Sequence, residues 1–285
     1  MSEHNETTPR LLAVFAHPDD EQWGTAGALT LLADRGVEIY VLSATSGDKG
    51  EISDPALASP ENLGEVREAE LREACAILEF QPPILWRYGD GTLAEIDRDA
   101  LVGKIVAEIR RLQPQVVLTF DANGGYGHLD HITVHHATLA AFDLAASPTY
   151  DPASGPPHAV AKLYATAYPQ SSFDLMDADL RRLGLPTIDF GPVQTVFGEE
   201  LLTPDSVITT AVKVDGVFER RWESQKAHRT QFGPNSPFIA AGPEVARTWL
   251  RLDVFRRIHP APVPGDTLPD EDDLWAGLPL PGSRS

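Results

Sequence analysis

Cysteine, basic residues and long apolar runs are all scarce in this sequence. The only cysteine among the 285 residues is Cys75, so no disulfide can form within the chain. The formal net charge of −19 argues against a nucleic-acid backbone or an anionic membrane surface as the main partner. No stretch approaches the ~20 apolar residues of a membrane span, and residues 2–6 lack the apolar segment of a signal peptide. These absences lead us to expect a cytoplasmic protein.

The remaining composition is that of an ordinary soluble globular protein. Apolar residues make up 42% and charged residues 23% of the chain, and its length is enough to bury a sizeable core. We expect a single α/β domain over residues 1–258, of which 1–9 form a disordered leader. Residues 259–285 are rich in proline and acidic residues, so we expect a loose tail there.

Apolar runs alternate with helical patterns along the first half of the chain. The runs that predict buried strands are 11–16, 38–44, 84–86 and 116–120. Apolar residues at helical spacing predict helices at 22–35, 59–79, 99–112 and 132–145. The connections are too long for hairpins, so we expect parallel strands. The predicted fold class is α/β: a Rossmann-like, mostly parallel sheet flanked by helices, with the active site at the carboxyl ends of the strands.

The second half of the chain is harder to interpret. Apolar runs predict strands at 162–166, 207–214 and 248–255, and helical spacing predicts a helix at 218–227. Residues 174–205 show no clear pattern. There is no internal repeat and no sharp domain boundary.

Residues suited to a metal site follow two of the predicted strands. A His-Pro-Asp-Asp-Glu motif begins at His17, directly after the first strand, and a His-Leu-Asp-His motif ends at His131, after the fourth. A catalytic zinc needs three protein ligands and an open position for water, and His17, Asp20 and His131 could supply the ligands. Asp19 would then take a proton from the bound water, whose pKa the metal lowers towards ~7.

Each motif alone has a plainer explanation. A histidine and aspartates after a strand can form a turn with a capping carboxylate, and the later motif is equally ambiguous by itself. Together, at two parallel-strand ends, they favour a metal site. His135 lies four residues after His131 on the predicted helix and is a rival ligand, whereas we expect His136 to be structural or exposed.

The two motifs are specific as a pair. Residues 16–21 read Ala-His-Pro-Asp-Asp-Glu, and residues 124–131 read Gly-Gly-Tyr-Gly-His-Leu-Asp-His. The pair resembles the PIG-L/LmbE-like zinc-dependent N-deacetylases. That family includes N-acetylglucosaminyl-inositol and N-acetylglucosaminyl-malate deacetylases and an amidase acting on mycothiol conjugates. The resemblance covers about the first 145 residues and returns weakly at 226–231.

The resemblance implies a bound metal and a base beside it. Its zinc ligands match His17, Asp20 and His131, and its general base matches Asp19. Fe²⁺ is an alternative to Zn²⁺, because histidine and aspartate ligands suit both ions.

The resemblance also implies roles for the later motif. His128 matches the histidine that stabilises the oxyanion or protonates the leaving amine. Tyr126 resembles a mobile tyrosine that polarises the amide carbonyl. Asp130 would orient His128 or His131, since the histidines of metal sites usually need such a partner.

The resemblance also implies contacts to the substrate. Arg67 matches an arginine that contacts the sugar, although it could instead be a surface residue paired with Glu70, three positions on. Asp90 would bind sugar hydroxyls. Trp23 is a departure from the family pattern, and because it is bulky and directly follows the acidic residues, we expect it to line the pocket. His228 matches the family by position and has no assigned role.

The function we expect is a metal-dependent hydrolase that removes an N-acetyl or related N-acyl group from an amino-sugar conjugate. Its products would be acetate and a primary amine, and its partner a small-molecule N-acetyl amino sugar. A metallophosphatase with a dinuclear site is one alternative. A sugar-binding relative without turnover is another. The sequence is also compatible with a homo-oligomer.

Overall fold

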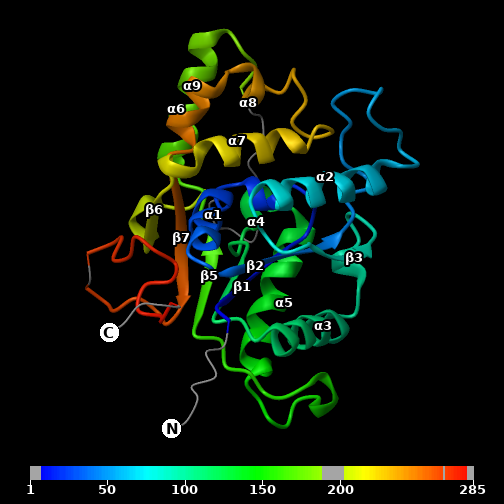
Figure 1. The fold of residues 1–285 in the computed structure, drawn as a ribbon, viewed down its shortest axis with the longest axis vertical. Coiled ribbons are helices and arrows are strands. Elements are labelled where there is room, and N and C mark those ends of the chain that lie inside the picture. The colour runs from blue at the N-terminus through cyan, green and yellow to red at the C-terminus, as the bar shows by residue number, and fades with distance from the viewer. Residues whose placement is uncertain (1–7, 188–201, 266, 281–285) are drawn as a thin grey trace.

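A sheet of seven strands runs through the part of the chain that the structure describes, residues 8–187, 202–265 and 267–280 (Figure 1). This computed structural model orders the strands β3-β2-β1-β4-β5-β7-β6. The strands are β1 Arg10–Phe15, β2 Glu38–Thr45, β3 Ile84–Tyr88, β4 Val116–Thr119, β5 Lys162–Thr166, β6 Thr210–Lys213 and β7 Leu252–His259. Strands β1 to β5 are parallel, and β7 runs antiparallel to both β5 and β6. The predicted mostly parallel α/β sheet is therefore confirmed.

Strand β1 lies at the centre of the parallel part. Leu11 pairs with Ile39 of β2 on one side and with Val116 of β4 on the other. The side chains from Leu11 to Phe15 are fully buried, as expected for a strand covered by helices on both faces. Its apolar run therefore extends to the polar loop at its carboxyl end.

Helices cover both faces of the sheet. The helices of the described residues are α1 Ala26–Asp34, α2 Leu63–Ile77, α3 Arg98–Leu112, α4 Gly124–Gly127, α5 Leu129–Ala145, α6 Gln170–Leu183, α7 Phe218–Ala227, α8 Pro237–Ala240 and α9 Pro243–Trp249. Figure 1 shows α1, α2 and α7 on one side of the sheet and α3 and α5 on the other. Cys75 on α2 faces the core at 1% exposure, and burial raises the pKa of its thiol well above the ordinary value. None of the helices in the described ranges is long and apolar enough to cross a membrane.

The ends of α3 show why this segment is helical. Asp97 precedes the helix, and its Oδ1 accepts the Ala100 N–H at 2.9 Å. Leu101, Ile105 and Ile109 form a buried stripe at helical spacing. The helix then ends before Pro114, which cannot continue it.

The structure differs from the sequence-based expectation in the second half. The segment predicted as one strand at 248–255 instead contains the end of α9 and the start of β7. The 174–205 region, which showed no pattern, contains most of α6, and its residues 188–201 lie outside the described residues. An antiparallel strand between β5 and β6 could not be anticipated from the alternating pattern of the first half.

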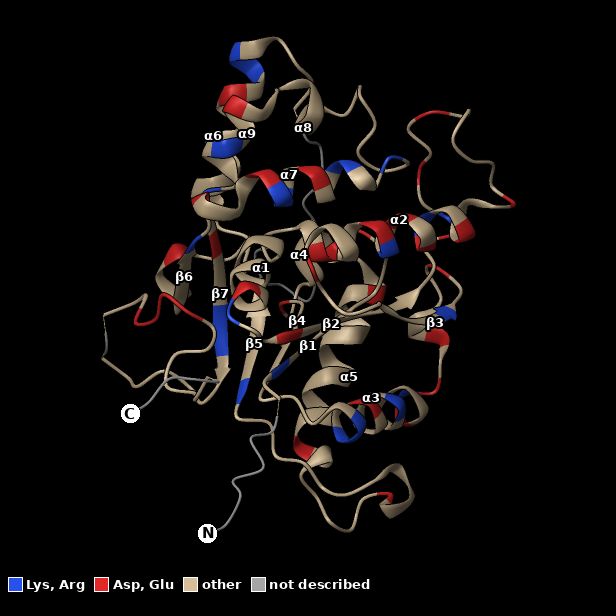
Figure 2. Ribbon diagram, viewed as in Figure 1, with Lys and Arg blue, Asp and Glu red and all other residues tan. Residues whose placement is uncertain are grey.

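The C-terminal segment is packed, in contrast to the loose tail we expected. Trp275 is 1% exposed, and the Ala211 N–H of β6 donates to the Glu271 carbonyl. The Glu271 carboxylate pairs with Lys162 at 2.6 Å and with Arg257 at 2.7 Å. Figure 2 marks basic residues on β5 and β7 and acidic ones in the segment beside them. The acidic residues therefore compensate two buried cations of the sheet.

Candidate metal centre

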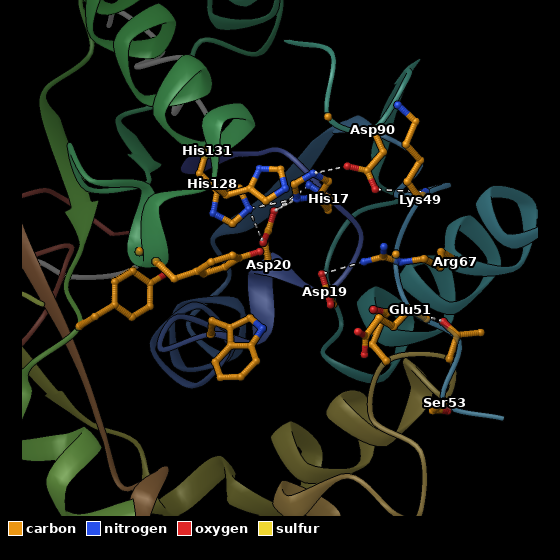
Figure 3. A pocket seen from close by; sticks show the side chains of 18 of the residues that line it. His17, Asp19, Asp20, Lys49, Glu51, Ser53, Arg67, Asp90, His128 and His131 are labelled. Atoms are coloured by element: carbon orange, nitrogen blue, oxygen red, sulfur yellow. Dashed lines mark hydrogen bonds and ion pairs between the residues drawn. The ribbon is translucent and has the colours of Figure 1, made fainter. Parts of the chain in front are cut away.

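The predicted site residues meet at the carboxyl edge of the parallel strands. The loop after β1 carries His17, Asp19 and Asp20, the loop after β3 carries Asp90, and His131 lies in the first turn of α5. All of these line one cavity of about 610 Å³. Figure 3 shows the labelled side chains reaching it from different parts of the chain. The sheet edge thus brings together residues that are far apart in the sequence.

Three donor groups converge as a metal site requires. His17 Nδ1 lies 3.0 Å from His131 Nε2. Asp20 Oδ2 lies 3.5 Å from His17 Nδ1, and Asp20 Oδ1 lies 3.3 Å from His131 Nε2. Ligands bound at about 2.0–2.2 Å around a tetrahedral zinc lie roughly 3.3–3.6 Å apart. The two distances to Asp20 fall in this range, and the distance between the histidine nitrogens is slightly shorter, so the donor set fits a single zinc-sized ion after a small movement of the rings.

The outer nitrogens of both histidines face protein groups. His131 Nδ1 lies 3.1 Å from the Gly124 carbonyl. His17 Nε2 lies 3.1 Å from Asp90 Oδ1 and 3.4 Å from Asp130 Oδ2, although neither contact has the angle of a hydrogen bond. Such partners fix the ring orientation and tautomer of a metal ligand.

Asp130 lies elsewhere than we predicted. We expected it to orient His128 or His131, but its carboxylate lies beside His17. Its two oxygens also accept the Gly91 and Leu93 N–H groups, at 2.7 and 3.0 Å. The reason is geometric: the first turn of α5 faces the loop after β3, so the carboxylate bonds across that gap.

His135, the rival ligand, and His128 differ in their position relative to the donor set. His135 Nδ1 lies 2.7 Å from the Phe120 carbonyl, and burial lowers the pKa of His135 to about 4. His128, by contrast, offers a ring nitrogen that lies within 4.8 Å of those of His17 and His131. Of the two, His128 is therefore the histidine beside the donor set.

Asp19 points into the cavity next to a buried arginine. Its Oδ1 lies 3.1 Å from Arg67 Nη2. Burial raises the pKa of Asp19 to about 6, although Arg67 opposes this shift. Its backbone φ is 113°, a conformation that residues other than glycine rarely adopt.

Arg67 holds the loops of the site together. It is 4% exposed, and its guanidinium donates to the Pro18 carbonyl at 2.6 Å and to the Gly47 carbonyl at 2.8 Å. It does not pair with Glu70, whose carboxylate accepts from Thr230 instead. Arg67 also lines the cavity.

Tyr126 lies at the mouth of the cavity. It is 46% exposed, and its ring centroid lies 5.8 Å from that of His128. Gly124 and Gly125 before it have φ values of 61° and 72°, and an added Cβ at Gly125 would lie 3.2 Å from the Tyr168 ring. Glycine is therefore required for this turn.

The sequence reasoning missed several cavity-lining residues. Lys49 and Glu51 lie in the loop after β2, and its position at the end of a predicted strand was a usable signal. Tyr168 and Phe173 lie between the predicted strand at 162–166 and the 174–205 region, where no motif marked them. Trp23 lines the cavity as expected, and its ring packs edge-on against Phe238 at 5.1 Å.

A mostly parallel α/β sheet that gathers histidine and aspartate donors around an open cavity defines a class of α/β metalloenzymes. The family model described as PIG-L, GlcNAc-PI de-N-acetylase, matches residues 12–142. A 1D-myo-inositol 2-acetamido-2-deoxy-alpha-D-glucopyranoside deacetylase of Acidothermus cellulolyticus is 34% identical over 290 residues, covering 94% of each chain. One of the same name from Rhodococcus jostii is 35% identical, covering 94% of this chain and 98% of the relative. The chain belongs to the PIG-L family, which confirms the resemblance of the motifs.

Solved structures share the fold. An N,N'-diacetylchitobiose deacetylase from Pyrococcus horikoshii gives a TM-score of 0.65 at 18% identity, covering 90% of this chain and 87% of that one. GalB, a 4-carboxy-2-hydroxymuconate hydratase from Pseudomonas putida, gives 0.60 at 19% identity, covering 90% and 98%. Because proteins named as a deacetylase and as a hydratase both match, the fold alone does not define the reaction.

Proposed function

We propose that this chain is a metal-dependent N-deacetylase that hydrolyses the acetamide of an amino-sugar conjugate to acetate and a primary amine. The observation that carries the proposal is the convergence of His17, Asp20 and His131 on one point, with Asp19 beside it in an open cavity. The names of the curated relatives support a 2-acetamido-2-deoxy-glucopyranoside of inositol as the substrate class.

The protonation states of the proposed ligands suit the binding of a cation. Burial and the nearby His17 lower the pKa of His131 to about 4 against the effect of Asp20, so His131 is neutral and its nitrogen free to bind at pH 7. Burial alone would raise the pKa of Asp20. The attraction of His131 and the hydrogen bond with His17 outweigh burial, so the pKa of Asp20 lies below its ordinary value. We propose zinc, which when bound would acidify a water and polarise the amide carbonyl.

Three side chains would carry the proton transfers. Asp19 would accept a proton from the attacking water, and a pKa of about 6 suits a base that works near neutral pH. Tyr126 would donate a hydrogen bond to the amide carbonyl of the substrate. Burial, and to a smaller extent the charge of Asp20, raise the pKa of Tyr126, so its phenol keeps the proton that it would donate. Burial and His17 lower the pKa of His128, which makes its protonated ring a better acid towards the leaving amine.

The polar side of the cavity would bind the sugar. Asp90 lines it, its Oδ2 accepts the main-chain N–H of Lys49 at 3.2 Å, and its Oδ1 lies 3.1 Å from His17 Nε2. A sugar hydroxyl would therefore bind to a second lone pair of these oxygens. Arg67 also lines it, but three protein oxygens hold its guanidinium. We propose that Arg67 acts on the substrate mainly by holding Asp19.

A metallophosphatase would need a second metal ion. Among the described residues, two further groups of possible metal donors are His17, His128 and His131, and His17, Asp90 and Asp130, of which only the second adds carboxylates. That second group shares His17 with the proposed ligand set, and backbone N–H groups already occupy both oxygens of Asp130. One bound metal per chain therefore supports deacetylation, and two would support phosphoester chemistry.

The decisive experiment measures acetate and primary-amine release from a panel of N-acetylglucosaminyl conjugates, with Asp19→Asn beside the wild type. We expect turnover by the wild type and a loss of about 10²–10⁴-fold in Asp19→Asn with its metal retained. Asp54→Asn, an exposed carboxylate in the loop after β2, is the matched control and should behave as wild type. Full turnover by Asp19→Asn would contradict the assignment of the base.

A further inference from the structure

The buried carboxylate of Glu21 collects three N–H donors behind the metal centre. Its Oε2 accepts the main-chain N–H of Asp19 at 3.1 Å. Its Oε1 lies 2.8 Å from Gln22 Nε2 and 2.6 Å from His228 Nε2. Glu21 and His228 are both 0% exposed. A carboxylate removed from water needs such donors, and His228 supplies one from a distant part of the chain.

Asp19 depends on this carboxylate for its backbone position. Its φ of 113° is strained for a residue with a Cβ, and such a conformation persists only where its surroundings hold it. Glu21 binds its N–H, and Arg67 binds its side chain. If Glu21 turned away, the strained peptide would lose one of these two restraints.

His228 is itself firmly placed. It follows the last residue of α7, and Ser224, one turn earlier, accepts a hydrogen bond from Gln22 Nε2 at 2.7 Å. Beyond it, the Thr230 N–H and hydroxyl bind the Glu70 carboxylate of α2 at 2.9 and 2.6 Å. The imidazole is therefore held between α7 and α2 and presents Nε2 to Glu21.

We propose that His228 is a positioning residue for the reaction. Through Glu21 it fixes the strained backbone of Asp19, and so aims the Asp19 carboxylate at the water it deprotonates. His228 is not among the described residues that line the cavity, so it acts without touching the substrate. The inference rests on the proposed function, in which Asp19 is the base.

The test compares His228→Leu, which removes the donor at similar bulk, with His228→Gln, whose amide can place an N–H near the position of Nε2. In the metal-loaded full chain we expect His228→Leu to lower kcat about 10- to 100-fold, with KM and metal content unchanged. His228→Gln should recover most of the loss. Glu21→Gln replaces one acceptor oxygen by an amide donor. Because both residues act through one contact, kcat of the double variant Glu21→Gln with His228→Leu should fall no further than kcat of the more impaired single variant.

A second readout is independent of turnover. The backbone amide ¹H and ¹⁵N shifts of Asp19 report its bond to Glu21, and we expect them to move in His228→Leu and to return in His228→Gln. Unchanged Asp19 shifts in His228→Leu would overturn the inference, whatever the substrate. If the wild type released no acetate, the proposed function would be overturned instead. The Asp19 amide shifts would still show whether His228 fixes the Asp19 backbone through Glu21.

The matched control is Trp222→Leu. Trp222 lies on the same helix, is 7% exposed, and packs in a cluster with Phe218, Ala246 and Leu250. It should lower the free energy of unfolding and leave both kcat and the Asp19 shifts unchanged. If His228→Leu matched Trp222→Leu in every readout, the role of His228 would be structural only.

Discussion

At the scale of single residues, the carboxylate of Asp130 is one of the two that face the outer nitrogen of His17, Asp90 being the other. It lies 3.4 Å from the outer nitrogen of His17, and two backbone N–H groups fix it in place. Asp130→Asn would place an amide N–H against the main-chain N–H of Gly91 or Leu93 and would remove the negative charge of residue 130 beside the His17 ring. We expect zinc affinity, measured by competition with a chelator, to fall about 10- to 100-fold. Asp143→Asn, an exposed carboxylate on the same helix, should keep wild-type affinity, and equal affinities in the two variants would refute this prediction.

His135 makes stability depend on pH. Burial lowers its pKa from the ordinary 6.5 to about 4, with the like-charged His136 and Arg256 nearby. Between these values the unfolded chain binds a proton at this site that the folded chain does not, so stability falls as pH falls from about 6.5 to 4. Above that window the residue contributes nothing. The full effect is up to ~3 kcal/mol.

The measurement is urea unfolding of wild type and His135→Asn at pH 7.0 and 4.5. Asparagine can keep the N–H that His135 directs to the Phe120 carbonyl and does not titrate in this range. The variant should lose less stability than wild type on acidification. Parallel losses would show that other groups cause the acid sensitivity.

At the scale of elements, α1, α7 and β7 meet at the buried carboxylate of Asp253. It accepts the Ala28 N–H at 2.8 Å and the Arg221 guanidinium at 2.7 Å. A Cβ on Gly27 would lie 2.7 Å from Val214 Cβ and 2.9 Å from Asp253 Oδ2. Gly27→Ala should therefore destabilise the fold by about 1–3 kcal/mol in chemical denaturation, despite the better helix propensity of alanine.

The matched substitution for that prediction is Gly216→Ala. A Cβ there meets nothing within 4 Å, so the change should stay within about 0.5 kcal/mol. Equal effects at Gly216 and at Gly27 would mean that α1 can move away from β7 at little cost.

Elements were predictable where a local pattern decided them. The first strand, β1, ends at Phe15, close to the end of the apolar run that predicted it and just before His17. The parallel order of the strands brought both motifs to one edge of the sheet. The contacts of that edge were not predictable. Whether Asp130 faces His17 or His131 depends on how α5 meets the loop after β3, which no local pattern records. Likewise, the sequence offered Arg67 a partner three residues away, and only the folded chain shows that it bonds the loops after β1 and β2.

At the scale of the whole molecule, the C-terminal segment closes the β6 edge of the sheet. Trp275 is its main anchor, and its indole N–H donates to the Pro279 carbonyl at 3.1 Å. Trp275→Ala should cost about 3–5 kcal/mol of unfolding free energy. Among the described residues, none after 266 lines the cavity, so kcat of the folded fraction should be preserved.

Val263→Ala is the control for this segment, since Val263 is 64% exposed and should leave the unfolding midpoint unchanged. A wild-type midpoint in Trp275→Ala would mean that the segment rests on the sheet without stabilising it. Composition alone could not reveal this packing, because the cations that attract the acidic segment, Lys162 and Arg257, lie in separate strands.

The burial of Cys75 also makes the chain suitable for labelling at one chosen position. Its thiol lies in the core and stays protonated, so a maleimide dye should not react with the folded native protein. A thiol introduced by Leu129→Cys, at a position 61% exposed and next to His128, would take up the dye alone. The emission of that dye, beside His128 of the cavity lining, would then show in real time whether an amino-sugar conjugate binds, with no other change to the sequence.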